Sequence, residues 1–158
     1  DAAYFPGLEL RSGHRSAIEK AAQAFGDAVR AAVKFQHPLQ PFINVITHAM
    51  FYTKPDDPTA TYRNTVVFLP DSLDRSPCGT GTSARVASLF AKGELGLNEP
   101  FVHESVIGTQ FRARIVEPAM VGPYKGGIPE VSGSAYVTGL LKLVIDPADP
   151  LRHGFRLA

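Results

Sequence analysis

Hydrophobic residues near the start of the chain recur at the spacing of an amphipathic helix. Ser16-Ala17-Ile18-Glu19 has capping-box spacing, in which the serine and glutamate side chains each satisfy a free backbone N–H at a helix start. Beyond it, apolar residues follow at three- and four-residue steps and charged residues take the other face, which is typical of a surface helix. The pattern predicts a helix that ends at His37-Pro38, because the residue before proline is pushed out of the helical region.

Most of the remaining chain consists of runs rich in β-branched and aromatic residues, which are typical of strands. Turn formers separate these runs, notably Lys54–Pro58 and the glycine- and proline-rich loop Gly122–Gly127, while Gly108 indicates a bend or bulge. Because strands follow one another instead of alternating with helices, a doubly wound parallel fold is disfavoured. The predicted strands cover residues 43–53, 62–69, 101–107, 111–116, 128–136 and 140–145.

A second predicted helix follows Cys78 and ends at Lys92-Gly93. A helix that is apolar nearly all round is buried and has other elements wrapped around it. The predicted fold class is therefore α+β, with a curved, mainly antiparallel sheet around this central helix and the amphipathic helix packed outside. The apolar residues of the second helix are Ala84, Val86, Ala87, Leu89, Phe90 and Ala91.

Composition narrows the function classes. With 158 residues, 44% of them hydrophobic, the chain is long enough for one packed domain, residues 1–158. The net charge of +1 is spread along the chain, so binding to nucleic acid or anionic lipid has no support and we expect small-molecule or protein partners. No apolar run reaches the ~20 residues of a membrane span, and no signal-peptide pattern opens the chain. The five scattered histidines predict no metal site.

Cys78 is the single cysteine of the chain and precedes the glycine-broken turn into the second helix. The first N–H groups of a helix have no partner within it, and together with the helix dipole they favour a thiolate and can hold a carboxylate. Cys78 is therefore a candidate acid/base or nucleophile, and the alternative is a small buried hydrophobic residue. One cysteine cannot form an internal disulfide, which fits a reducing compartment, and we expect a soluble cytoplasmic protein.

The segment Asp74–Arg85 resembles the second catalytic motif of the proline racemase family, which includes proline racemases, hydroxyproline 2-epimerases and trans-3-hydroxyproline dehydratases. Glu104–Phe111, Val131–Gly139 and Asp149–Phe155 carry the same resemblance. It runs over nearly all of the chain but covers only the C-terminal half of the family's usual length. The resemblance implies the diaminopimelate-epimerase-like fold, in which two such domains face each other across the active-site cleft, and hence a missing N-terminal domain as partner.

The resemblance also implies roles for the motif residues. In the family, a pair of cysteines, one from each domain, works on opposite faces of the substrate's α-carbon, one as thiolate and the other as thiol, and Cys78 matches the second of the pair. The backbone N–H groups of Gly79 and Thr80 match positions that hold the substrate carboxylate. Asp74 matches the position that pairs with the substrate nitrogen, although the residues alone allow a turn or cap aspartate equally well.

Two strand residues bear on the choice of substrate and disagree. Phe68 matches a position that in proline racemases is an aromatic packing on the unsubstituted ring. His48 matches a position where hydroxyproline epimerases often have a histidine that can bond a ring hydroxyl. Because a pocket that hydrogen-bonds a hydroxyl discriminates strongly against the analogue lacking it, His48 has more weight and 4-hydroxyproline is favoured. Both residues are also ordinary on a half-buried strand.

The expected function is a racemase or epimerase that uses no organic cofactor and no metal and inverts the α-carbon of 4-hydroxyproline or proline. The chain alone should be inactive, since it supplies one face of a two-faced site. A homodimer is a possible assembly of the protein. Dehydratases of the family usually have threonine at the position of Cys78, so trans-3-hydroxy-L-proline dehydration is the alternative activity.

Three interpretations outside this chemistry also stay open. Gly79–Ala84 fits the Gly-x-Gly-x-x-Ala spacing of a dinucleotide-binding turn, which would need a βαβ unit ending in an acidic residue, whereas the strand from Phe101 is expected to be antiparallel. A cysteine hydrolase would need a histidine base, for which His48 or His103 could lie near the thiol in space. A non-catalytic module would bind amino acids with the carboxylate cradle alone.

Overall fold

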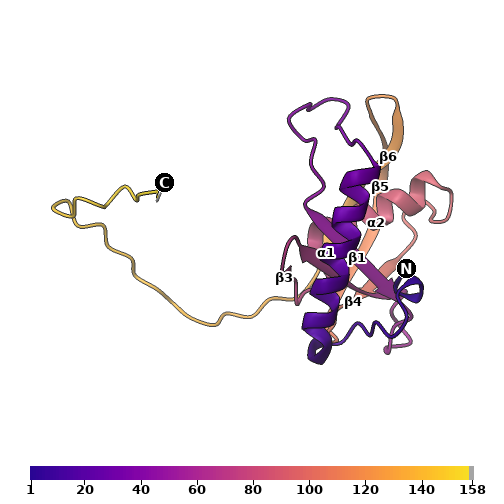
Figure 1. Cartoon of the computed structure of the whole chain (residues 1–158), viewed down its shortest axis with the longest axis horizontal. Helices are drawn as coiled ribbons and strands as arrows, with labels where there is room; N and C mark the ends of the chain where they lie inside the picture. Colours follow the sequence, from indigo (N-terminus) through magenta and orange to yellow (C-terminus); the bar gives the residue numbers. More distant parts are fainter. Residues whose placement is uncertain (157–158) are drawn as a thin grey trace.

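One six-stranded sheet organises the fold, with a helix against each of its faces (Figure 1). The computed structural model describes residues 1–156. The strand order is β1-β2-β4-β5-β6, and β3 pairs with β2 beside this path. The strands are β1 (His48–Thr53), β2 (Tyr62–Phe68), β3 (Ser72–Leu73), β4 (Phe101–Glu104), β5 (Gln110–Val121) and β6 (Tyr124–Ser132). The helices are α1 (Arg15–Ala32) and α2 (Gly79–Ala91), and two 3-10 turns, Ala2–Tyr4 and Ser12–His14, come before α1.

Four of the strand pairings are antiparallel, and the pairing of β2 with β4 is parallel. The predicted α+β class with a mainly antiparallel sheet is therefore confirmed. The prediction that the strand from Phe101 is antiparallel is wrong for its pairing with β2. Helix α2 returns the chain to the other end of the sheet, so β4 runs in the same direction as β2. Glu104, at the end of β4, is buried and its carboxylate bonds Arg63, so it does not offer a free carboxylate to a nucleotide ribose.

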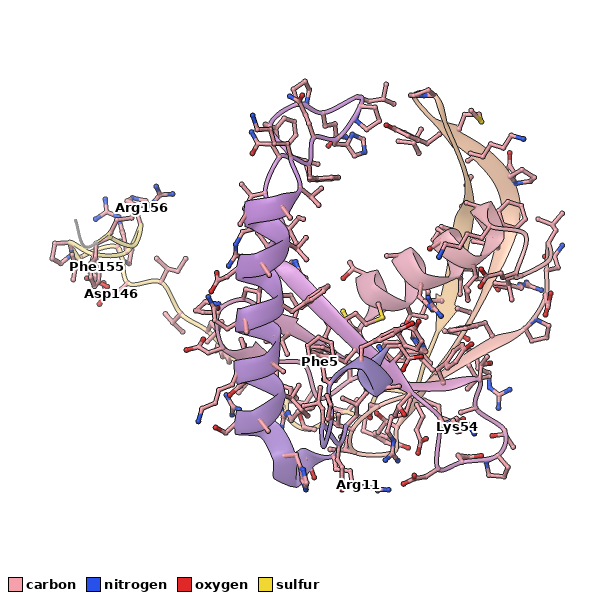
Figure 2. All side chains as sticks on the ribbon, turned by 45° about the vertical axis from the view of Figure 1, so that its right-hand side comes forward. Phe5, Arg11, Lys54, Asp146, Phe155 and Arg156 are labelled. Carbon is pink, nitrogen blue, oxygen red and sulfur yellow. The ribbon has the colours of Figure 1, made fainter. Side chains whose placement is uncertain are left out.

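The two helices bury different clusters. Helix α1 packs on the outer face of β1 and β2, and α2 lies on the opposite face, inside the curve of the β5–β6 hairpin (Figure 2). The outer cluster contains Ile18, Ala22, Ala49, Phe51 and Val67. The inner cluster contains Val86, Leu89, Phe101, Ala113 and Ile115. Ala84 and Ala91 of α2 are nevertheless exposed, so this helix is not enclosed on every side; alanine favours a helix without needing burial.

Helix α1 begins and ends earlier than predicted. Its N-cap is His14, and Glu19 accepts a hydrogen bond from Arg15 Nε at 2.7 Å instead of closing a capping box with Ser16. The 3-10 turn at Ser12–His14 leads directly into the helix, which places Ser16 within the first helical turn. The helix ends at Ala32, before His37-Pro38 is reached.

Two strand boundaries also differ from the prediction. β1 begins at His48 instead of residue 43, because its cross-strand partner is Phe68, the last residue of β2, and Pro70 beyond it has no N–H to continue a ladder. The predicted loop at 122–127 is a tight turn at Gly122-Pro123, since Val121 pairs with Tyr124 and β6 follows at once. Gly122 has a φ of 58°, which glycine adopts without a steric cost.

The chain leaves the sheet after Ser132 and extends away from it (Figure 1). The strand predicted at 128–136 stops at Ser132, and the one predicted at 140–145 is absent. Leu140, Leu141 and Leu143 are 89–95% exposed. A strand forms only where another strand offers it a hydrogen-bonding edge, and among residues 1–156 none lies beside this segment. None of the helices in the described part of the chain is both long and apolar enough to cross a membrane.

Candidate functional site

Cys78 is the N-cap residue of α2, directly before its first helical residue. Its Sγ accepts a hydrogen bond from the N–H of Gly81 at 3.3 Å and lies 3.4 Å from the hydroxyl oxygen of Thr80. Only 3% of the residue is exposed. A sulfur at this position faces the positive end of the helix dipole and a backbone donor, and both interactions favour a negative charge on it.

The backbone at Cys78 has a φ of 62° and a ψ of 114°, which non-glycine residues rarely adopt. Such a conformation costs about 1–3 kcal/mol and persists only where the surroundings hold it. The N–H of Cys78 donates to Ser76 Oγ at 3.0 Å, and that hydroxyl in turn donates to Asp74 Oδ1 at 2.8 Å. The strained residue is therefore tied back to the preceding turn.

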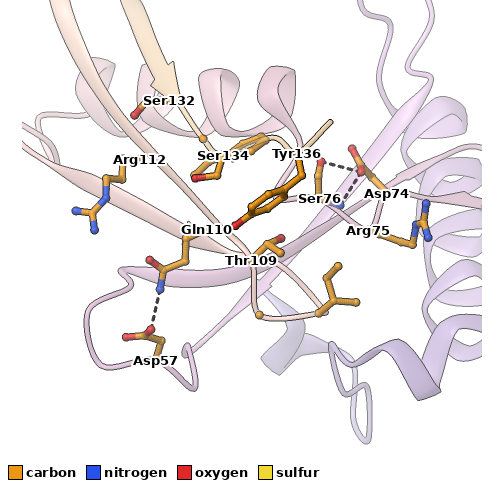
Figure 3. A pocket seen from close by; sticks show the side chains of 14 residues that line it. Asp57, Asp74, Arg75, Ser76, Thr109, Gln110, Arg112, Ser132, Ser134 and Tyr136 are labelled. Atoms are coloured by element: carbon orange, nitrogen blue, oxygen red, sulfur yellow. Dashed lines mark hydrogen bonds between the residues drawn. The ribbon is translucent and has the colours of Figure 1, made fainter. Parts of the chain in front are cut away.

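Asp74 occupies a turn position as well as the position that the motif gives it. Its Oδ1 accepts from both the N–H and the hydroxyl of Ser76, at 2.9 and 2.8 Å. Asp74 and Ser76 also line a cavity of about 870 Å³, whose other walls include the loop 107–109, the start of β5, the end of β6 and Tyr136 (Figure 3). Cys78 itself is not among the residues that line this cavity, but Ser76, which does line it, accepts the Cys78 N–H.

The two glycines after Cys78 have different surroundings. A Cβ on Gly81 would lie 2.7 Å from Val66 Cγ2 and 3.3 Å from Cys78 Sγ, so only glycine lets the helix start approach β2 this closely. A Cβ on Gly79 would meet nothing within 4 Å. Within residues 1–156, the N–H groups of Gly79 and Thr80 have no acceptor, as expected at the start of a helix, and both residues are exposed.

His48 and Phe68 are direct cross-strand partners on β1 and β2. Their ring centroids lie 4.4 Å apart at an interplanar angle of 66°. Because side chains alternate along a strand, Phe68 is on the same face as Val66, which contacts the start of α2. The structure thus brings His48 and Phe68 onto the face that carries Cys78, Gly79 and Thr80. His48 Nδ1 lies 2.7 Å from the Thr47 hydroxyl oxygen.

Neither histidine considered as a base bonds the thiol. His103 is fully buried and its Nδ1 lies 3.0 Å from the Thr82 hydroxyl oxygen. Burial lowers the pKa of His103 to about 3, and the nearby Arg85 charge adds to the effect. A ring that stays neutral to such a low pH and faces Thr82 is a poor base for Cys78. Within residues 1–156, no cluster of three or more His, Cys, Asp or Glu side chains is placed to hold a metal ion.

Sequence reasoning missed a buried polar cluster beside the thiol. Asn64 and Thr82 both donate to the carbonyl oxygen of Pro77, and His103 bonds Thr82. No local signal marked these residues, because Asn64 stands between Arg63 and Thr65, and Thr82 lies in the polar start of α2.

Comparisons with known proteins agree with this geometry. Residues 3–156 match the family model described as proline racemase. The proline racemase of Acetoanaerobium sticklandii is 42% identical over 149 residues, which make up 94% of this chain and 44% of the relative. The 4-hydroxyproline epimerase of Brucella suis is 46% identical over 125 residues, or 79% of this chain and 38% of the relative.

A solved structure extends the likeness to three dimensions. The crystal structure of a hydroxyproline epimerase from Agrobacterium vitis, with bound trans-4-hydroxy-L-proline, superposes with a TM-score of 0.76 at 30% identity. The match covers 96% of this chain and 43% of that one, so the chain spans less than half the length of these relatives. Since the family model matches almost every residue and the fold agrees, the chain belongs to the proline racemase family.

Proposed function

We propose that the chain is the C-terminal catalytic half of an amino-acid racemase or epimerase that needs no cofactor, and that Cys78 exchanges the α-proton on one face of the substrate. The observation that carries the proposal is the position of the Cys78 sulfur, which caps α2 and accepts the Gly81 N–H. The names of the relatives, proline racemase and 4-hydroxyproline epimerase, support the same reaction class.

The difficulty of this reaction is the charge that builds beside a carboxylate. As a thiolate, Cys78 would take the α-proton: the Cα–H bond breaks, an S–H bond forms, and the electron pair spreads from the α-carbon into the carboxylate. The free N–H groups of Gly79 and Thr80 would bind that carboxylate and stabilise it most when its charge is greatest. In the opposite direction Cys78 would donate its proton as a thiol.

The remaining substrate contact is assigned to Asp74. Because its Oδ1 already accepts two hydrogen bonds from Ser76, we assign Oδ2 as the acceptor for the substrate nitrogen. A carboxylate fixed by two local donors is held in one orientation before the substrate binds. That arrangement lets Asp74 serve both as a turn residue and as the partner of a cationic nitrogen.

Inversion needs a second proton carrier on the opposite face of the α-carbon, and we assign it to a cysteine of a second, N-terminal half. Two observations support such a half. The chain spans less than half of its relatives, and the segment 136–145 exposes several large apolar side chains that would be buried against another domain. We further propose that residues 1–158 form one domain of this two-domain protein, which we call the complete protein, and that the domain alone is inactive.

The substrate that we favour is trans-4-hydroxy-L-proline. The paired rings of His48 and Phe68 would form one wall of the site, with the flat face of Phe68 against the pyrrolidine ring and His48 available to a ring hydroxyl. The Agrobacterium vitis relative contains bound trans-4-hydroxy-L-proline, which supports this choice. L-proline would fill the same space without using the histidine.

The test is exchange of the α-proton in D2O on the complete protein, followed by NMR with L-proline and trans-4-hydroxy-L-proline. We expect exchange with inversion, faster for the hydroxylated substrate, and its loss in a Cys78→Ser variant. Exchange that persists in Cys78→Ser would refute the role of the thiol. With trans-3-hydroxy-L-proline as a third substrate, loss of its 3-hydroxyl as water, without inversion, would identify a dehydratase instead.

A further inference from the structure

The carbonyl oxygen of Pro77, one residue before the thiol, is bound by two buried side chains. Asn64 Nδ2 donates to it at 2.8 Å from β2, and Thr82 Oγ1 donates to it at 3.1 Å from the first turn of α2. Asn64 and Thr82 are fully buried. Two donors from different elements satisfy both lone pairs of this buried carbonyl oxygen and restrict the orientation of the peptide group.

Together with two further hydrogen bonds, these contacts hold both peptide groups that flank Cys78. The oxygen of the Pro77–Cys78 peptide is held by Asn64 and Thr82, and its N–H is held by Ser76 Oγ. On the other side of the residue, the carbonyl of Cys78 accepts the N–H of Thr82 at 2.8 Å. With both peptide planes fixed, the φ of 62° is imposed on Cys78, and this angle sets where its Cβ and sulfur point.

His103 fixes the direction of the Thr82 hydroxyl. A hydroxyl has one proton, and Thr82 donates it to Pro77, so its bond with His103 Nδ1 requires the imidazole to be the donor. His103 Nε2 is then the unprotonated nitrogen, and no partner contacts it within residues 1–156. Because burial keeps this ring neutral above a pH of about 3, the direction of the bonds is constant through the neutral range.

We propose that Asn64, Thr82 and His103 are positioning residues for the thiol: they hold the Pro77–Cys78 peptide so that the Cys78 sulfur stays on the N–H of Gly81 at the helix start. None of the three needs to touch the substrate. The catalytic part of this inference rests on the proposed function, whereas the effect on the thiol does not.

The decisive variant is Thr82→Val, which removes the hydroxyl and nearly preserves the shape. In the complete protein, mass spectrometry of the Cys78 peptide gives the rate of its alkylation by iodoacetamide at pH 7 and at pH 10. The ratio of the two rates reports the ionised fraction and cancels changes in access. Without the hydroxyl, Cys78 can relax from its strained φ and lose the Gly81 N–H, so the ratio should fall about fivefold.

Three further variants make the result specific. Thr82→Ser restores the hydroxyl and should restore the ratio, while Asn64→Leu removes the other donor and should lower it. Ser105→Ala is the matched control, because Ser105 is fully buried and its hydroxyl bonds Thr109 and the Ile107 N–H, away from Pro77. It should cost stability and leave the ratio unchanged. If Thr82→Val does not fold, the Asn64→Leu result decides.

The outcomes separate the two proposals. A lowered ratio with slower α-proton exchange supports both. If the ratio of alkylation rates falls but Cys78→Ser leaves α-proton exchange unchanged, the positioning role is supported and the proposed function is refuted. A ratio equal to that of the unmodified protein in Thr82→Val and Asn64→Leu, with Cys78 still required for exchange, overturns the positioning role alone.

Discussion

The rings of His48 and Phe68 face each other across the β1–β2 pair, with their centroids 4.4 Å apart. The two residues that gave conflicting signals about the substrate are thus neighbours in a single surface. A histidine that packs on Phe68 has a restricted orientation and can present a ring nitrogen at a fixed place. Under the proposed function, this pair would distinguish substrates that differ by one hydroxyl.

Replacement of His48 by alanine should lower kcat/KM for trans-4-hydroxy-L-proline about tenfold, the size of one lost hydrogen bond, and change that for L-proline much less. Phe68→Leu should lower kcat/KM for both substrates, since each would pack on the same aromatic ring. His14→Ala, a change at an exposed histidine before α1, is the control. Equal losses for the two substrates in His48→Ala would show that this residue does not read the hydroxyl.

Alanine at Gly81 should destabilise the protein by about 1–3 kcal/mol, because its Cβ would lie 2.7 Å from Val66 Cγ2. The same change should slow α-proton exchange, since the Cβ also presses on the Cys78 sulfur. Gly79→Ala is the matched control, with open space around its Cβ, and should leave the unfolding midpoint nearly unchanged.

A double variant checks the cause of the Gly81→Ala effect. Val66→Ala removes the methyl group that the new Cβ would meet. The double variant should recover part of the stability lost by Gly81→Ala, so that the two changes are not additive. Additive losses in the unfolding free energy would place the strain elsewhere.

His103 should make the protein sensitive to acid. Its pKa is about 3 in the fold, below the ordinary value of 6.5, so the unfolded chain binds the extra proton first as the pH falls. Above pH 6.5 His103 is neutral in both states and does not change the free energy of unfolding. Between pH 6.5 and 3, this free energy should fall by about 1.4 kcal/mol for each pH unit. Urea unfolding at pH 7, 6 and 5 measures this slope.

His103→Gln should flatten that slope, whereas His14→Gln should not. Glutamine keeps a donor for Thr82 and does not titrate. A slope that is the same in His103→Gln and in the unmodified protein would mean that other groups cause the acid sensitivity.

The amides of residues 136–145 should exchange slowly with deuterium in the complete protein and rapidly in the isolated chain. Buried strand amides are protected by their ladder, while the large apolar side chains here are exposed and this segment pairs with no strand within residues 1–156. The amides of β5 provide the internal reference. Rapid exchange of this segment in both forms would mean that the second half does not cover it.

The parts of the fold that sequence predicted are those with a local cause. The start of α2 followed from a glycine-broken turn before an apolar run, and the strands followed from their β-branched and aromatic residues. The direction of β4 against β2 could not be predicted, because it depends on a partner some forty residues away in the chain. The segment 140–145 has a strand composition, yet a strand needs an edge to pair with.

The candidate site divides in the same way. Cys78, Gly79 and Thr80 lie together in the sequence, so one motif identifies them. Thr82 and His103 meet only because α2 packs against β4, and no local pattern connects two polar residues on separate elements. Their hydrogen bond therefore could not be predicted from the sequence.

Alternate residues of β2 each contact α2 or the candidate site. Tyr62 stacks with Arg85, Asn64 binds the Pro77 carbonyl, Val66 touches the start of α2, and Phe68 pairs with His48. A slip of one residue in the register of this strand would turn all four side chains to the other face at once. The site therefore depends on β2 as a unit: a one-residue insertion or deletion within this strand would displace all of these contacts in one step, whereas a point substitution would change them one at a time.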